Sequence, residues 1–232
     1  QYIFGFHEPY PFSSDRTFTL RAGSQKFYRG AYEESRVKTE SEARQYLDSD
    51  HHLFLAFAWR LDDVSLGGIS ASAPSTIATT PGSILLSYPR LSLRYAELEN
   101  NTYGGPKGLL AELKLDAAGA ATGSDIEFFR GSASADYYKP LFDRYADLRH
   151  LLHIGIEAGW IEAGSDGMPF YENYFLGGPH SFRGFEYREV GPHEQGEPLG
   201  GGALLRGTIE YSTPLFFREL RAIAFLDWGL LE

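Results

Sequence analysis

The feature that most constrains this chain is a two-residue alternation of apolar and polar side chains, repeated in segment after segment. In the clearest segment, Leu152, Ile154 and Ile156 alternate with His153 and other small or charged residues. A period of two places successive side chains on opposite faces of a β-strand. The same pattern recurs at 16–23, 53–60, 90–96, 109–116, 132–137, 205–212 and 222–229. We therefore expect an all-β, antiparallel fold.

Alternation by itself fits either a soluble β-sandwich or a membrane β-barrel, because both have one apolar and one polar face. Here the polar faces carry Gly, Ser and mid-strand charges, as a water-filled lumen tolerates, and the apolar faces carry Leu, Ile, Tyr and Trp. Each segment approaches the ~9–11 residues that a tilted membrane strand needs. Aromatic residues make up 15% of the chain, and membrane barrels use them at both interfaces. These features favour an antiparallel transmembrane β-barrel.

The segments between these strands predict loops and turns. Residues 31–50 are rich in charge and predict a solvated loop, with a helical turn at about Glu40–Arg44. Asp62 and Asp63 predict a turn, after which a return strand begins at Val64. Residues 70–82 hold Ser, Thr, Ala and Pro without charge and predict a loop. The count is about eleven strands.

Composition argues against several classes of function. The net charge of −10 argues against nucleic acid and against a polybasic contact with anionic lipid. No cysteine is present, which removes disulfides, thiolate metal sites and cysteine nucleophiles. No G-x-S-x-G motif occurs, and the neighbouring histidines His51 and His52 point to opposite faces of a strand. We expect no enzyme activity, metal or cofactor.

The stretch from Phe175 to Phe185, FLGGPHSFRGF, is the main candidate functional segment. Its glycines and proline allow a tight loop that re-enters a confined space. Asp227 lies in an apolar run, where an unpaired charge is costly. Strand parity places Glu210 and Asp227 on the polar face, where Arg183 of an infolded loop could reach both. A solvated arginine in a surface loop and an aspartate at a strand end fit the spacing equally well.

Three ordered motifs resemble the C-terminal barrel of the BamA-type outer-membrane protein insertases: FLGGPHSFRGFEYREVGP, LGGGALLRGTIEYSTPLF and AFLDWG. The resemblance implies a sixteen-stranded barrel in the bacterial outer membrane, with a lumen-inserted loop at 177–198. The residues that match the family motifs are the loop glycines Gly177 and Gly178, the tip Phe182, Arg183, Gly184 and Phe185, the strand motif Phe225, Asp227 and Gly229, and the second acid Glu210. Phe182 departs from the Val or Ile usual in the family.

The resemblance also implies a role in folding and inserting other outer-membrane proteins. The expected partners are unfolded barrel clients, outer-membrane lipid and accessory lipoproteins or other subunits of an assembly complex. A two-partner secretion or TamA-like translocator, the barrel of a patatin-like lipase fusion, and a plain porin remain alternatives. Because the family barrel has further strands on both sides, we expect 1–232 to be one incomplete barrel domain whose first and last strands do not pair, with receptor domains upstream.

Overall fold

The computed structural model describes the whole chain except residues 1, 10–14, 102–104, 142–149, 166 and 216–219. It is almost entirely β-structure, in agreement with the predicted fold class. The elements are β1 Tyr2–Pro9, β2 Arg16–Tyr28, β3 Glu33–Tyr46, β4 Leu53–Gly67, α1 Ser75–Thr79, β5 Ser83–Asn101, β6 Gly105–Ala118, η1 Ala120–Thr122, β7 Phe128–Leu141, β8 His150–Ala163, η2 Phe170–Glu172, β9 His193–Glu194, β10 Glu197–Pro198, β11 Ala203–Pro214 and β12 Arg221–Leu231. No helix in the described part of the chain is both long and apolar enough to cross a membrane.

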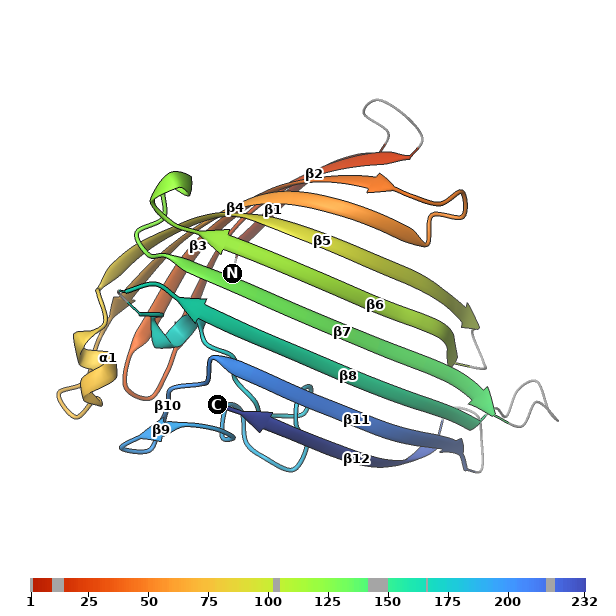
Figure 1. Ribbon diagram of the computed structural model, residues 1–232. Helices are drawn as coiled ribbons and strands as arrows, with labels where there is room; N and C mark the ends of the chain where they lie inside the picture. The colour runs from red at the N-terminus through yellow and green to blue at the C-terminus, as the bar shows by residue number, and fades with distance from the viewer. Residues whose placement is uncertain (1, 10–14, 102–104, 142–149, 166, 216–219) are drawn as a thin grey trace.

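Ten strands form one antiparallel sheet in the order β1-β2-β3-β4-β5-β6-β7-β8-β11-β12. The sheet curves like part of a barrel wall, as Figure 1 shows. Among the described residues, β1 and β12 are the two ends of the sheet and do not pair with each other, as the partial-barrel prediction requires. The strands β9 and β10 form a separate small hairpin within the long segment that joins β8 to β11.

The alternation in the sequence corresponds to an apolar outer face and a polar inner face. On β4, Phe57 is 51% exposed, whereas Asp62 on the opposite face is 2% exposed. Large apolar side chains are exposed on the outer face along most of the sheet, including Leu55, Leu93, Ile154, Ile156, Leu205 and Ile209. A membrane barrel has this distribution, because lipid covers its outside and its lumen holds the polar groups.

The sequence prediction for 31–50 was wrong, because these residues form β3 rather than a loop. Between 34 and 44, every even-numbered residue of β3 is charged and the odd-numbered residues are uncharged. Glu40 forms ion pairs across to Arg21 on β2 (2.7 Å) and Arg60 on β4 (3.2 Å). The charges therefore line the inner face, where most of them form ion pairs, so a densely charged segment can form a strand.

Two smaller expectations were also wrong. The strand β4 runs without interruption through Asp62 and Asp63, because both residues pair with β3 and β5 and keep the alternation of faces. The segment 70–82 contains the short helix α1, whose Ile77 is fully buried. In both places, contacts with neighbouring elements outweigh the local turn signals.

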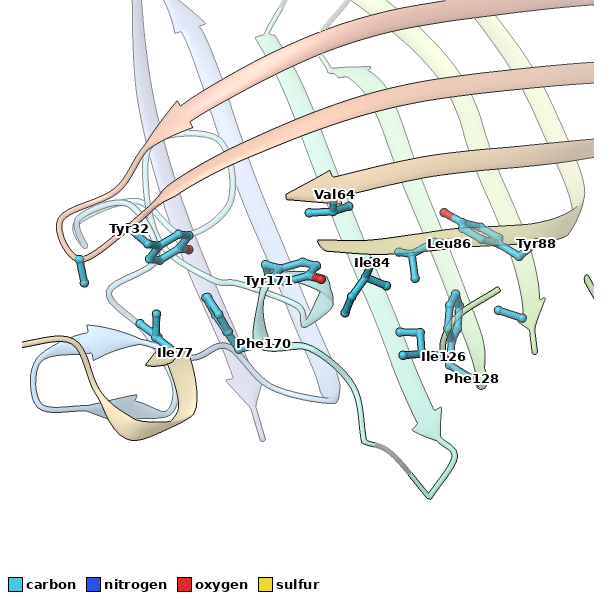
Figure 2. Packing of buried hydrophobic residues seen from close by; sticks show 12 residues of the cluster. Tyr32, Val64, Ile77, Ile84, Leu86, Tyr88, Ile126, Phe128, Phe170 and Tyr171 are labelled. Carbon is cyan, nitrogen blue, oxygen red and sulfur yellow. The ribbon is translucent and has the colours of Figure 1, made fainter. Parts of the chain in front are cut away.

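One end of the sheet, here called the loop end, carries the connections 29–32, 68–82, 119–127 and 164–202. Side chains from all four connections pack in one apolar cluster with the adjoining strand ends. Figure 2 shows Ile77 of α1 facing Phe170 of η2, with Tyr171, Ile84 and Ile126 nearby. This cluster, the loop-end core, closes part of that end of the sheet.

The β9–β10 hairpin is attached to α1 by Glu194. Its carboxylate accepts hydrogen bonds from the hydroxyl groups of Thr76 (2.5 Å) and Ser75 (2.7 Å) and from the backbone N–H of Ser75 (2.9 Å). These hydrogen bonds, first that from the Thr76 hydroxyl and then that from Ser75, lower the pKa of Glu194 below its ordinary value.

Candidate functional site: a loop docked on the inner face of the sheet

The segment from 164 to 202, the β8–β11 loop, contacts strands that are far apart in the sheet. Its side chains reach β3 and β7 near the start of the loop, and β11 and β12 further along. Only the inner, concave side of a curved sheet brings these strands within reach of one loop. The loop therefore lies on the inner face, at the loop end.

At the tip of the loop, Arg183 binds two acids and a threonine of the wall. Its Nε and Nη2 donate to the two carboxylate oxygens of Asp227, at 2.8 and 2.6 Å, and its backbone N–H adds a third bond at 3.1 Å. Nη1 donates to Glu210 at 2.5 Å, and Nη2 also donates to Thr208 at 2.8 Å. The planar guanidinium fork suits this bidentate arrangement, which the point charge of a lysine cannot reproduce.

An aromatic ring lies against the guanidinium, and two more rings pack within the tip. Its carbon lies 3.6 Å from the ring centre of Phe225, which shares the inner face of β12 with Asp227. Within the tip, the rings of Phe182 and Phe185 are 5.1 Å apart. Phe182 also packs against a small apolar cluster of Leu176, Leu204 and Leu231. The structure thus brings together the tip, the strand motif and the second acid that the sequence singled out.

The glycines of the loop serve different needs. Gly177 has φ +127°, and a Cβ there would lie 2.3 Å from the carbonyl oxygen of Glu186, so both conformation and space require glycine. Gly178 also has a positive φ of 96°. Gly184 has φ +90° but nothing within 4 Å of a Cβ position. Its role is therefore conformational, as a tight loop requires. Gly229 lies beneath the side chain of Leu176.

A second polar cluster lines the inner face between β3 and β7, and sequence analysis did not identify it as a unit. Asp116 accepts two hydrogen bonds from Arg90, at 2.6 and 2.7 Å, and one from Arg130 at 3.1 Å. Glu172, at the start of the loop, forms ion pairs with Arg36 (2.6 Å) and Arg130 (3.4 Å). We call these five residues the wall network. They border a cavity of about 280 Å³.

The sequence carried a signal for Glu172 that was not used. It is a lone carboxylate among aromatic residues in PFYENYF, which is the argument that singled out Asp227. Arg36 and Arg130 have no comparable local signal. Their partners come from other strands and from the loop, and only the folded chain brings them together.

A second cavity of about 280 Å³ adjoins the docked tip. On its wall, His153 lies 2.8 Å from Asp136 and stacks on Tyr138. Arg206 donates to Glu157 (2.6 Å) and to the backbone carbonyl of Ser181 in the tip (3.1 Å), which adds another contact between loop and wall. Within the described residues, no group of three or more His, Asp or Glu side chains is arranged to hold a metal ion.

Comparison with known proteins places the chain in a family. The model of the Omp85 superfamily domain matches residues 1–231, which is nearly the whole chain. The chain belongs to the Omp85 superfamily. This confirms the resemblance and the barrel fold class that the sequence predicted.

Curated Omp85 relatives cover most of the chain at low identity. The sorting and assembly machinery component 50 homolog of Homo sapiens is 26% identical over 225 residues, covering 94% of this chain and 45% of that protein. The Xenopus tropicalis homolog is 30% identical over 176 residues, covering 75% of this chain and 35% of its own length. The outer membrane protein assembly factor BamA of Nitratidesulfovibrio vulgaris is 25% identical over 182 residues, covering 76% and 22%. The chain spans less than half the length of these relatives.

A solved Omp85 structure has the same fold. The crystal structure of BamA from Haemophilus ducreyi lacking POTRA domains 1-3 aligns with a TM-score of 0.78 at 16% identity, covering 99% of this chain and 49% of that one. The relatives come from animals as well as from bacteria, so the family match places the chain among outer-membrane barrels without restricting it to bacteria.

Proposed function

We propose that this chain forms part of the barrel wall and the lumen loop of an outer-membrane protein assembly factor. Such a factor helps to fold and insert other outer-membrane barrel proteins. Its partners would be unfolded barrel clients, membrane lipid and other subunits of an assembly complex. The observation that carries the proposal is the docked tip, in which Arg183 binds Asp227 and Glu210 on the inner face of β11 and β12. The names of the animal and bacterial relatives, which describe assembly factors, support the same role.

The docked loop argues against a plain diffusion pore. A pore needs an open passage, whereas here η2 of the β8–β11 loop and α1 pack together at one end of the curved sheet. A porin also has no need for an arginine held by three side chains of two adjacent strands. In our proposal the site is non-enzymatic: Arg183 fixes the loop, and Phe182 and Phe185 pack its tip.

The test is an insertion assay with the full-length protein reconstituted in liposomes. A urea-denatured barrel protein is added, and its folded fraction is followed by heat-modifiable migration on gels. We expect Arg183→Ala and Asp227→Ala to slow client folding while the reconstituted protein itself stays folded. Arg183→Lys should recover only part of the rate, because lysine lacks the fork.

The matched control is Arg16→Ala, which removes an exposed arginine whose Nε donates to Gln45 on the neighbouring strand. This variant should fold clients at the wild-type rate. Equal client folding in Arg183→Ala, Asp227→Ala and wild type would contradict the proposed role of the loop. If the wild-type protein folds clients no faster than empty liposomes, the assembly function itself is wrong.

A further inference from the structure

Glu172 lies at the base of the β8–β11 loop, well before the tip in sequence, and its side chain is only 4% exposed. One carboxylate oxygen lies 2.6 Å from Nη1 of Arg36 on β3. The other accepts a hydrogen bond of 3.4 Å from Nη1 of Arg130 on β7. Three strands separate β3 from β7 in the sheet, so a single carboxylate of the loop links two distant parts of the wall.

The two arginines do not depend on Glu172 for neutralisation. Arg36 also pairs with Glu34 at 3.0 Å, and Arg130 also donates to Asp116 at 3.1 Å. Each arginine therefore keeps an acidic partner on the wall when Glu172 is removed. What Glu172 adds is the connection between wall and loop, since it is the only one of these three acids that lies in the loop.

Apolar contacts hold the same part of the loop against the wall. Phe170 and Tyr171 are both buried in the loop-end core. The ring of Phe170 meets that of Tyr32, beside β3, edge to face at 5.1 Å. The guanidinium of Arg36 lies 5.8 Å from the ring centre of Tyr171. The loop base is therefore oriented by both charge and packing.

The segment between base and tip is short and hydrogen bonded. Tyr174 exchanges two backbone hydrogen bonds with Gly201, both 2.9 Å, and its hydroxyl donates to the carbonyl of Gly131 on β7 at 3.2 Å. Leu176, fully buried, accepts a backbone hydrogen bond of 3.0 Å from Val190. This short, hydrogen-bonded segment is the path by which the base is connected to the tip.

We propose that Glu172 is a positioning residue for the docked loop. It fixes the loop base to β3 and β7, and this sets the position from which Arg183 reaches Asp227 and Glu210. The loop then connects two regions of the wall, β3 to β7 and β11 to β12. This role deepens the proposed assembly function, and its effect on client folding rests on that function.

The test is hydrogen–deuterium exchange of the folded, full-length protein in lipid nanodiscs. In Glu172→Gln, backbone amides of peptides covering 177–190 should exchange at least about tenfold faster, because the change removes the negative charge that pairs with Arg36 and Arg130. Peptides from β11 and β12 should keep wild-type rates. The matched control is Glu186→Gln, an exposed glutamate in the same loop, which should leave 177–190 unchanged.

The position of the effect separates positioning from local stability. If Glu172 only stabilises its own turn, faster exchange stays within 168–174, and the tip peptide keeps the wild-type rate; that result overturns the proposal. If Glu172 positions the tip, both changes release the same tip. Amides of 177–190 in the double variant Glu172→Gln/Arg183→Ala should then exchange more slowly than the product of the two single-variant accelerations predicts. Fully additive effects in this peptide would also overturn it.

A milder variant covers the case in which Glu172→Gln does not fold. Arg36→Lys keeps the positive charge beside Glu34 and Glu172 but loses the fork, and it should give a smaller increase in the same 177–190 peptides. An unchanged tip peptide in this variant contradicts the proposal. The exchange result does not depend on client folding. A liposome assay in which wild type is inactive would therefore count against the assembly function alone.

Discussion

The base and the tip of the β8–β11 loop are held by similar chemistry in different surroundings. At the base, the side chains of Glu172 and Asp116 are 4% and 2% exposed, and they lie beside the buried aromatic residues of the loop-end core. At the tip, the side chains of Arg183 and Glu210 are each 24% exposed and that of Asp227 is 7% exposed, and all three adjoin a cavity. Desolvation makes buried charges costly when a partner is lost, whereas lumen water screens partly exposed ones.

The base and the tip therefore differ in how easily they open. Disrupting the base costs more free energy, so the base belongs to the stable part of the fold. The tip depends on the number and geometry of the bonds that Arg183 makes, and water can replace some of them. A contact that water can replace is better suited to opening and closing during function than a desolvated one.

The largest effect should come from the wall network. Asp116→Ala leaves Arg90 and Arg130 without their shared carboxylate in a buried setting and should reduce stability by ~3–5 kcal/mol. Urea unfolding in detergent micelles, followed by heat-modifiable migration, measures the shift. If Asp116→Ala loses less stability than Asp227→Ala, the charges at the base are not more strongly desolvated than those at the tip.

At the tip, Asp227 should matter more than Glu210. Asp227 accepts three hydrogen bonds from Arg183 and one from Thr208 (2.6 Å), whereas Glu210 accepts one from Arg183. We expect Asp227→Ala to cost ~1.5–3 kcal/mol and Glu210→Ala ~1 kcal/mol, because charged hydrogen bonds differ in number at the two sites. The same urea titration compares them. The reverse order would mean that the bidentate pair is not the main contact.

A smaller effect is expected at Gly184, where only the backbone conformation requires glycine. Gly184→Ala should cost about 1–2 kcal/mol, because an L-residue is strained at positive φ. The control is Gly123→Ala, which has φ +77° in the β6–β7 connection and equally open surroundings. Both variants should lose similar stability, and Gly184→Ala alone should accelerate limited proteolysis within 177–190. Equal proteolysis in both would show that Gly184 has no particular link to loop docking.

The smallest effect concerns the pH dependence of the β9–β10 hairpin. Hydrogen bonds from Thr76 and Ser75 lower the pKa of Glu194, so the contact contributes fully above the ordinary value of 4.5 and is lost as the pH falls below it. Hydrogen exchange of 192–199 should therefore accelerate below about pH 4.5 relative to the intrinsic rate. Glu194→Gln should remove this dependence. If the exchange rates of wild type and Glu194→Gln coincide at every pH, Glu194 does not cause the pH dependence.

The sequence alone determined the class of fold and the parity of the inner face. A period of two is a local property, so β2, β8, β11 and β12 could be recognised without their partners, and the same parity placed Glu210 and Asp227 on one face. The loop glycines were likewise readable, because a positive φ and a tight turn are local requirements. Gly184, with φ +90°, fits that rule.

Tertiary structure decided which charges meet. Strand β3 was mistaken for a loop because it is densely charged, and the partners on β2 and β4 that stabilise those charges cannot be seen in its own sequence. In the same way, Glu172 forms ion pairs with both Arg36 and Arg130. These arginines lie on β3 and β7, which are not consecutive in the chain, and neither strand directly precedes or follows the loop. Ion pairs on an inner face depend on the register and curvature of the whole sheet, so they exist only once the chain has folded.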